Sequence, residues 1–480
     1  MGKKYETVIG LEVHVELSTK TKIFCSCPIS FGEEPNSNIC PVCTGMPGSL
    51  PVLNKKAVEY AIAVGLGTGC SITQYSQFDR KNYFYPDNPQ NYQITQLYMP
   101  ICTKGALEIE TKSGVKNISI REIHLEEDAG KLFHDQETSS SFVDYNRSGI
   151  PLIEIVTEPD MENEEEVIAF IKKLKSIIQY LGASDCKLQE GSMRVDVNLS
   201  VREAGAKALG VRTEMKNLNS LKAITRAIEG ERKRQEKILR DGGEIIQKTR
   251  RWDDEKGLSF AMRGKEDVKD YRYFPDPDLI PLRISNQWIE EIKASQPEFR
   301  TKKIARFKKE YDIPDYDIEL LTESNYMAEF FEKTANLCGN PKKAANWLMV
   351  ETMRLLKEKG IEPKELKYSP ENLAKLIGLV DKKVINGDKA KEVFHHMFEQ
   401  NMDPEKYVEE NGLRAVRDER ILKKAVEEVI AGNPKSVEDF LRGKEKVMGF
   451  FVGQTMKALK GRGDPEIITQ LLKERLKEGL

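Results

Sequence analysis

The feature that most limits the fold of this chain is an early stretch, residues 7–17, in which apolar and polar side chains alternate. Its apolar positions are Leu11, Val13, Val15 and Leu17. A repeat of two residues is the repeat of a β-strand, so Glu12, His14 and Glu16 share the opposite face. The stretch therefore predicts a strand with one apolar side and one side that carries metal-binding or acid/base groups.

Other parts of the chain repeat this pattern or add acidic residues to it. These segments are residues 123–128, 152–158, 193–202 and 211–216. In the third segment Arg194, Asp196 and Asn198 would face outward. In the fourth segment Glu214 and Lys216 would do so. A single Glu-x-His pair usually lies on a solvated face, but strands of one sheet would gather these groups together. Because carboxylates bind Mg²⁺ and Lys or Arg binds phosphate oxygens, the pattern indicates a site for Mg²⁺ and a polyphosphate.

The composition is that of an ordinary globular protein, with 32% charged and 39% hydrophobic residues in 480. A chain of this length holds about two to four domains. No run approaches the roughly 18 apolar residues of a membrane span, and the first residues lack the apolar core of a signal peptide. We therefore expect a cytoplasmic protein with no membrane segment. The formal net charge is only −2, so binding to a nucleic acid would depend on local basic patches.

Four of the eight cysteines form two close pairs. One residue separates Cys25 from Cys27, and two residues separate Cys40 from Cys43. In a chain without a secretory signal, this grouping favours a structural zinc knuckle of four thiolates over disulfides. The alternative is a set of incidental thiols, since the spacing of the first pair is tighter than usual. A four-thiolate site has no open position for chemistry, so we expect it to brace a loop.

The chain divides into three predicted parts. Strand alternation dominates the first part, where Ser220 is placed to cap a helix. Helix signals then replace the alternation, for example Ser369 followed by Pro370, which is typical of a helix start. The predicted domains are residues 1–294, 295–405 and 406–480.

Two further segments bear on ligands. Residues 78–89 combine Pro, Asn and aromatic side chains, which favours an ordered loop that presents Arg80 and Lys81. In the predicted tail, Lys and Arg residues flank the apolar segment 447–453. A core helix with solvated lysines explains that segment, and so does a module that contacts RNA phosphates. No Walker A sequence occurs, so an ATP site here requires another architecture.

Together these motifs resemble the B-subunit (GatB/GatE) family of tRNA-dependent amidotransferases. The segments that carry the resemblance are residues 9–17, 78–89, 124–131, 144–160, 189–200, 214–221 and 270–278. It extends over nearly the whole chain, because residues 443–476 are similar to that family's tail. The resemblance implies an α+β fold, in which a cradle-like β-sheet catalytic domain precedes an all-α helical domain and a small YqeY-like helical tail. The short stretch between Gly243 and Asp278 leaves no room for the inserted domain of the archaeal E subunit, which favours the B type.

The resemblance also implies a reaction with its cofactors and partners. ATP would phosphorylate the side-chain carboxyl of Glu-tRNA(Gln) or Asp-tRNA(Asn), and ammonia would then displace the phosphate. In this family an amidase A subunit releases the ammonia from glutamine, and a small C subunit clamps the two into a heterotrimer. The helical domain and the tail would contact the misacylated tRNA. The implied cofactors are ATP and Mg²⁺, with Zn²⁺ in the knuckle as a structural metal.

Individual site residues follow from matching the family's motifs. The residues at its metal-binding positions are Glu12, His14 and Glu127, with Glu214 as a fourth candidate. Imidazole suits softer metals than Mg²⁺, which makes His14 an unusual ligand. The candidates for phosphate and nucleotide contacts are Lys81, Arg194, Asn198, Lys216 and Asn217. The predicted catalytic set is Glu12, His14, Glu127, Glu214 and Lys216.

Two other classes of function stay open at this point. A non-catalytic, zinc-containing RNA-binding scaffold would use the knuckle and the basic tail, and would have no need for clustered Glu12, Glu127 and Glu214. An ATP-dependent ligase acting on a small free carboxylate would use the cradle, but would leave the helical half of the chain without a role.

Overall fold

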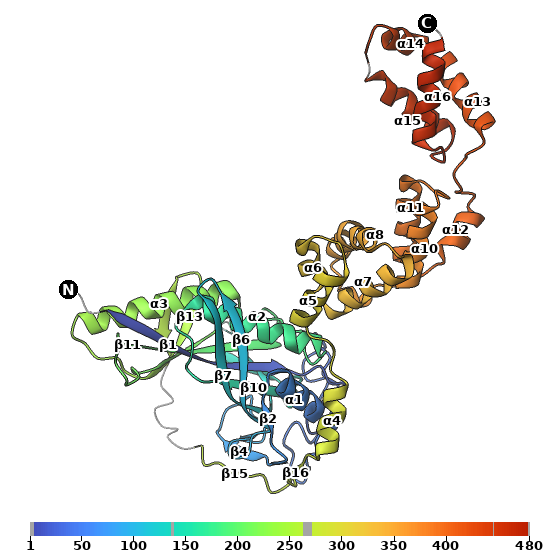
Figure 1. The fold of residues 1–480 in the computed structure, drawn as a ribbon. Coiled ribbons are helices and arrows are strands. Elements are labelled where there is room, and N and C mark those ends of the chain that lie inside the picture. The colour runs from blue at the N-terminus through green and yellow to red at the C-terminus, as the bar shows by residue number, and fades with distance from the viewer. Residues whose placement is uncertain (1–3, 136–138, 263–270, 445, 479–480) are drawn as a thin grey trace. The chain divides into compact units, whose positions relative to one another are not determined.

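The computed structural model describes residues 4–135, 139–262, 271–444 and 446–478 (Figure 1). The chain forms two compact units, residues 1–299 and 300–480. The first unit contains the β-sheets, and the second is helical throughout its described residues. The predicted α+β fold, with a sheet domain followed by helices, is therefore confirmed. No helix in the described part of the chain has both the length and the apolar character that a membrane crossing requires.

A large mixed sheet organises the first unit. Within the described residues its order is β14-β13-β12-β11-β1-β10-β7-β6-β2. The strands are β1 (Tyr5–Glu16), β2 (Ser71–Ile72), β6 (Cys102–Thr111), β7 (Gly114–Glu127), β10 (Pro151–Thr157), β11 (Met193–Glu203), β12 (Thr213–Lys216), β13 (Lys248–Asp253) and β14 (Leu258–Ala261). Neighbouring strands are antiparallel except for the parallel pair β12 and β13. The predicted strand β1 lies between β10 and β11, so its polar face adjoins theirs.

Three helices cover the apolar face of this sheet, namely α1 (Lys55–Gly67), α2 (Glu164–Tyr180) and α3 (Leu221–Arg240). The apolar residues of β1 are buried against them, as the period of two predicts, and Leu11, Val13 and Val15 are at most 1% exposed. Ser220 caps α3 as predicted, because its hydroxyl accepts a hydrogen bond from the amide of Ala223 at 3.0 Å. The opposite face is left for polar side chains.

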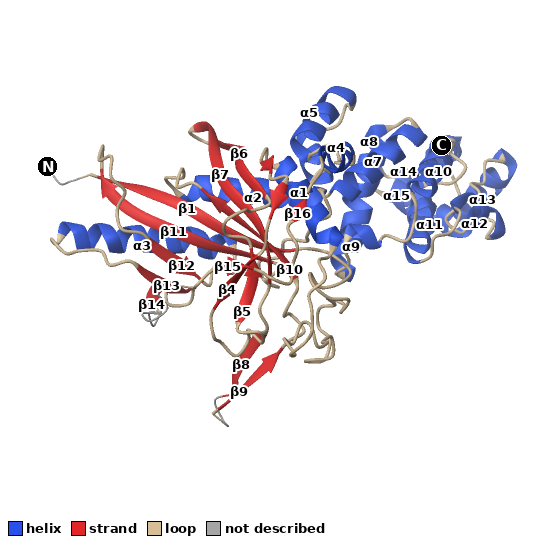
Figure 2. Cartoon of the chain, turned by 90° about the horizontal axis from the view of Figure 1, so that it is seen from below, coloured by secondary structure: helices blue, strands red, loops and turns tan. Residues whose placement is uncertain are grey.

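Smaller sheets complete the first unit. One consists of β15 (Phe274–Pro275), β4 (Asp79–Asn82) and β5 (Tyr92–Thr95). The loop predicted for residues 78–89 is wrong at residues 79–82, because Arg80 and Lys81 lie in β4 and pair with the neighbouring strands. The others pair β3 (Tyr75–Ser76) with β16 (Leu282–Arg283) and β8 (Lys131–Asp135) with β9 (Ser140–Asp144). The pair β8 and β9 projects away from the main sheet (Figure 2). Helix α4 (Asn286–Ala294) ends the unit and packs on α1.

The second unit consists of short helices. They are α5 (Arg300–Glu310), α6 (Asp315–Leu321), α7 (Asn325–Cys338), α8 (Pro341–Asn346), a π-helical turn (Trp347–Thr352), α9 (Met353–Lys359), a 3₁₀ turn (Pro363–Glu365), α10 (Pro370–Asp381), α11 (Gly387–Glu399), α12 (Pro404–Glu410), α13 (Glu419–Ala431), α14 (Pro434–Leu441), α15 (Val447–Ala458) and α16 (Pro465–Glu478). The predicted helix start at Ser369 is confirmed, since its side chain accepts a hydrogen bond from the amide of Asn372.

The buried apolar residues of the second unit form two separate cores. One extends from Phe307 to Leu413, and the other from Leu422 to Leu476. The predicted division at residues 405 and 406 falls within α12, and the three-domain assignment stays a prediction.

Candidate active site

The polar face of the main sheet brings together side chains from four adjacent strands, β11, β1, β10 and β7. His14 on β1 lies opposite Glu154 on β10 and opposite Arg194 on β11. Glu154 in turn lies opposite His124 on β7. The strand register therefore gathers groups that are more than a hundred residues apart in the sequence into one row.

The first cluster on this face consists of His14, Glu126 and Glu154, whose ligand atoms all lie within 4.8 Å of one another. The Nε2 atom of His14 is 3.7 Å from a carboxylate oxygen of each glutamate. A further hydrogen bond of 2.7 Å joins His124 Nε2 to Glu154 Oε2. An imidazole and two carboxylates converge here, which is a donor set that can hold a divalent cation.

Burial and neighbouring charges shift the pKa values of this cluster in different directions. Burial raises the pKa of Glu154, but the hydrogen bond from His124 and the nearby cation Lys81 outweigh it and hold this pKa at about 2. Burial and the Glu154 carboxylate raise the pKa of Glu126. Burial disfavours the charged form of Lys81, yet Glu126 and Glu154 raise its pKa overall. Lys81 on β4 therefore lies close enough to these carboxylates to interact with them electrostatically.

A second cluster consists of Glu12, Asp196 and Glu214, from the neighbouring strands β1, β11 and β12. Their ligand atoms also lie within 4.8 Å of one another. Burial, together with the like charges of Glu154 and Glu214, raises the pKa of Glu12. Three carboxylates in one place repel one another, and a bound cation would relieve that repulsion. The hard oxygen donors fit Mg²⁺.

Polar side chains surround this second cluster. Asn198 donates a hydrogen bond of 3.0 Å to Glu12 Oε1. Lys216 Nζ lies 2.6 Å from Asp196 Oδ2 and 2.7 Å from Glu214 Oε1. Although burial disfavours its ammonium group, these two carboxylates raise the pKa of Lys216. The structure thus brings four of the predicted residues together here, namely Glu12, Asn198, Glu214 and Lys216.

Arg194 lies beside these clusters on β11. Its Nη2 donates to Asp128 Oδ2 at 3.0 Å, and 35% of its side chain is exposed. Arg147 also approaches Asp128, at 3.4 Å. Burial and the Asp128 carboxylate raise the pKa of Glu16, which completes the row on β1. Arg194 is consequently fixed at one end and partly open to a ligand.

Glu127 lies outside both clusters. Successive residues of a strand point to opposite sides, so Glu127 points away from Glu126. Its Oε1 accepts hydrogen bonds from Gln90 Nε2 at 2.5 Å and from the amide of Ile94 at 3.0 Å. Burial raises its pKa to about 8. It lines a cavity of about 300 Å³ together with residues of the cysteine knuckle, and its assignment as a metal ligand stays a prediction.

Asn217 immediately follows β12. It adopts a left-handed backbone conformation with φ of 68°, and its side-chain amide donates to the carbonyl of Trp252 at 3.0 Å. The left-handed conformation ends β12, and the hydrogen bond joins the end of this strand to β13. The predicted contact of Asn217 with phosphate stays a prediction.

Sequence reasoning did not assign Glu126, Glu154, Asp196 and His124 to the site. A signal for Glu154 and Asp196 was present, because both occupy outward positions of alternating segments. What was missing was the order of the strands, which alone reveals that they adjoin His14 and Glu12.

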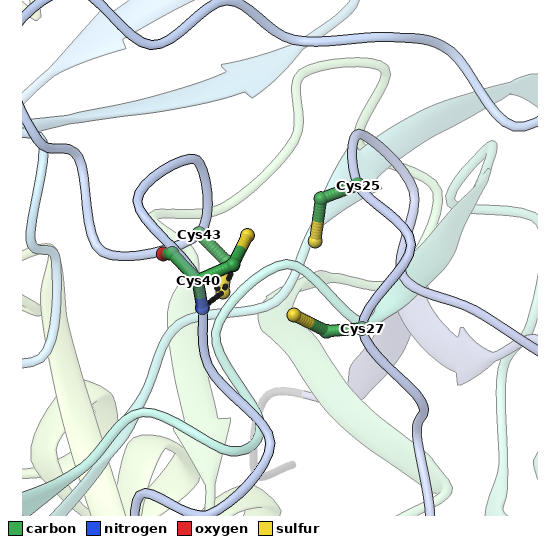
Figure 3. A group of neighbouring side chains, drawn as sticks. All are labelled: Cys25, Cys27, Cys40 and Cys43. Carbon is green, nitrogen blue, oxygen red and sulfur yellow. Dashed lines mark hydrogen bonds between the residues drawn. The ribbon is translucent and has the colours of Figure 1, made fainter.

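The four cysteines of the predicted knuckle lie together, with Cys25 and Cys27 on one loop facing Cys40 and Cys43 on another (Figure 3). Their sulfur atoms lie within 4.8 Å of one another, and those of Cys40 and Cys43 are 3.9 Å apart. Zinc bound to four thiolates at about 2.3 Å needs sulfurs roughly 3.8 Å apart. A hydrogen bond from Cys25 lowers the pKa of Cys43 to about 4, which favours a thiolate. The arrangement fits a structural zinc ion.

Comparisons with known proteins decide the family. A model of the GatB/GatE catalytic domain matches residues 7–290, and a model of the GatB domain matches residues 329–476. The chain belongs to the GatB/GatE family. The catalytic-domain match includes every residue of both acidic clusters and of the cysteine knuckle.

Curated relatives match from end to end, and each is named as the B subunit of aspartyl/glutamyl-tRNA(Asn/Gln) amidotransferase. The relative from Agathobacter rectalis is 64% identical over 474 residues, which cover 99% of this chain and 100% of the relative. That from Lachnospira eligens is 60% identical over 482 residues, which cover 99% of this chain and 100% of the relative. That from Thermoanaerobacter pseudethanolicus is 54% identical over 473 residues, which cover 98% of this chain and 99% of the relative. The predicted family is thereby confirmed.

Proposed function

We propose that this chain is the B subunit of an aspartyl/glutamyl-tRNA amidotransferase and carries out ATP-dependent transamidation of Glu-tRNA(Gln) and Asp-tRNA(Asn). The observation that supports this most is full-length similarity to relatives with that name, combined with a charged polar face inside the catalytic-domain match. The amidase A subunit and the small C subunit are its proposed partners, together with misacylated tRNA. A chain that acts on tRNA works where translation occurs, so the proposal extends to the cytoplasm.

The chemistry has two steps. A carboxylate resists amidation because oxide is a poor leaving group. In the first step an oxygen of the side-chain carboxylate attacks the γ-phosphorus of ATP, ADP leaves, and an acyl phosphate forms. In the second step ammonia attacks the acyl carbon, phosphate leaves, and the nitrogen loses a proton to give the amide. Phosphoryl transfer needs positioning and charge neutralisation more than a protein nucleophile.

The polar face carries residues that would bind the metal ions of this reaction. Glu12, Asp196 and Glu214 would hold one Mg²⁺. His14, Glu126 and Glu154 would hold a second divalent cation, and Mg²⁺ bound at these clusters would neutralise charge on the transferring phosphoryl group. Glu12, His14 and Glu214 come from the predicted metal set and the other three are added to it, while Glu127 stays a predicted ligand outside both clusters.

Cationic side chains complete the proposed site. Lys81 approaches from β4 and Arg194 from β11, so that phosphate oxygens between them would meet positive charge from two sides. Lys216 and Asn198 orient the carboxylates that they contact. Zinc in the cysteine knuckle has a structural role in this proposal, because four thiolates leave no position for a substrate.

The test is phosphate release from ATP by the chain assembled with its A and C partners. We compare wild type with Glu12→Gln and Glu154→Gln, each with Glu-tRNA(Gln), with Asp-tRNA(Asn) and without tRNA. Glu108→Gln is the matched control, since Glu108 is an exposed residue of β6 in the same sheet. We expect tRNA-dependent release that falls about 100-fold or more in the two site variants and is unchanged in the control. Glutaminase activity of the A subunit should persist in all of them.

Two outcomes would contradict the proposal. Unchanged release in both site variants would remove the acidic clusters from the chemistry. A wild-type complex that releases no phosphate with either tRNA would favour the RNA-binding scaffold instead.

A further inference from the structure

One buried lysine contacts the cysteine knuckle and takes no part in the proposed chemistry. Lys22 follows β1 and is 0% exposed. Its Nζ lies 3.4 Å from Cys43 Sγ, in hydrogen-bond range, and donates to the carbonyl of Tyr145 at 3.0 Å. Within the described residues these are its side-chain hydrogen-bond partners, and neither is a carboxylate. A buried cation costs free energy unless a negative charge lies nearby, and of these two contacts only the Cys43 sulfur, as a thiolate, can supply one.

A metal-loaded knuckle supplies that charge. Zn²⁺ with four thiolates carries two net negative charges. The same burial that penalises a lone ammonium penalises this excess of negative charge, and pairing relieves both. Because Lys22 contacts the most buried of the four ligand residues, Cys43, it is placed to offset part of the charge directly at a sulfur.

The backbone fixes Lys22 in this position. Its amide donates to the carbonyl of Cys27 at 2.9 Å, which ties it to the first cysteine loop. On the other side lies the turn of residues 145–149, whose Ser148 hydroxyl donates to the carbonyl of Cys43 at 3.1 Å. A Cβ atom added at Gly149 would lie 3.5 Å from Lys22 Cδ and 3.7 Å from Cys43 Cβ. The lysine is therefore enclosed between both cysteine loops and this turn.

We propose that Lys22 is the counter-ion of the zinc knuckle, raising its affinity for zinc and clamping it onto the turn of residues 145–149. The inference rests on the zinc site of the proposed function, but not on the transamidation reaction. Lys22 is a positioning residue, since it touches a ligand sulfur and does not bind the metal. Groups that orient or charge-balance metal ligands commonly change metal affinity about 10- to 100-fold.

The first test measures zinc affinity in the assembled complex by competition with a chromogenic chelator, and needs no turnover. We compare wild type with Lys22→Met, which keeps the length without the charge, and Lys22→Arg, which keeps the charge. Lys20→Met is the control, because Lys20 is exposed two residues away. We expect zinc affinity to fall at least about tenfold in Lys22→Met, to recover substantially in Lys22→Arg, and to stay unchanged in the control. Wild-type affinity in a folded Lys22→Met complex would overturn the proposal.

A second test uses wild type alone, in case Lys22→Met does not fold. An amine-reactive reagent is applied to the complex before and after zinc is stripped, and modification of Lys22 is measured by mass spectrometry relative to Lys55, whose side chain is 76% exposed. We expect Lys22 to be protected with zinc bound and modified several-fold faster without it. Equal modification in both states would overturn the clamp. A wild-type complex that binds no zinc would overturn the inference while leaving the test of transamidation intact.

Discussion

Two consecutive carboxyl groups at the end of β7 have opposite surroundings. Glu126 faces His14 and Glu154 on the polar side of the sheet. Glu127 faces Gln90 and the amide of Ile94, with no cation at its oxygens among the contacts that the described residues show. Burial without a compensating charge keeps the proton on Glu127, so its pKa is about 8. Glu126 thus has two imidazoles and the Lys81 ammonium near its carboxyl group, whereas the hydrogen bonds described for Glu127 come from neutral groups.

This difference predicts how Glu127→Gln changes stability with pH. A carboxyl whose pKa is raised in the folded state stabilises the fold fully below its unfolded pKa, and this contribution is lost as pH rises through the folded value of about 8. Glutamine can accept the same two hydrogen bonds without ionising. We expect the variant to match wild type near pH 4.5 and to gain up to roughly 3 kcal/mol over it at pH 7, at about 1.36 kcal/mol per pH unit.

The measurement is hydrogen-exchange protection of β7 amides in both proteins between pH 5 and 8, corrected for intrinsic exchange rates. If the protection of wild type and of Glu127→Gln changes with pH in parallel across this range, then Glu127 ionises in the folded protein, as a metal ligand does.

The two-residue period predicts which side chains share one face of a strand, but it does not predict which strands lie side by side. The alternation in β1 places Glu12 and His14 on one face, and the structure agrees. The two-residue period does not indicate whether Glu126 or Glu127 lies on the polar face, because the sequence does not show where the regular alternation of buried and polar positions in β7 ends. Asp196 is a similar case, because its approach to Glu12 depends on β11 pairing with β1.

At the scale of elements, Arg80 joins β4 to the segment that contains β15. Its Nε donates to the buried Asp276 at 2.8 Å, and its Nη2 donates to Asp278 at 2.7 Å. The guanidinium also stacks 4.1 Å from the ring centroid of Tyr92. The same segment contains Tyr271, whose ring centroid lies 5.1 Å from the Lys81 ammonium. The sequence predicts an ordered loop here, but not that residues 79–82 form a strand that pairs with a remote segment.

We predict that Arg80→Lys loosens this segment, because an ammonium cannot make both carboxylate contacts and the ring contact at once. The expected loss is about 1–3 kcal/mol in the stability of the segment, seen as faster tryptic cleavage near Arg272. Arg283→Lys is the control, since Arg283 is an exposed residue of β16 in the same part of the chain. Equal cleavage rates in wild type and Arg80→Lys would show that the backbone pairing of β4 and β15 suffices by itself.

At the scale of the molecule, each of the two units has apolar cores of its own among the residues that the structure describes. The core of the first unit, including its partly buried residues, ends at Phe299, and the next core begins at Ile304. The sequence indicated this change of architecture, because strand alternation stops near residue 295. It could not indicate that the helical part has two cores, since helix periodicity shows which face is apolar but not which helices share it.

Separate cores predict that residues 1–299 fold without the rest of the chain. A domain with its own core keeps its structure when a neighbour that adds nothing to that core is removed. We expect this piece to unfold in one cooperative transition by circular dichroism and to retain zinc. Under the proposed function it should lose tRNA-stimulated phosphate release by about tenfold or more, because the helical unit is the proposed tRNA contact.

Retained turnover of free glutamate or aspartate by this piece would instead support a ligase for small carboxylates. Failure of the piece to fold would mean that the first unit depends on contacts beyond its own core.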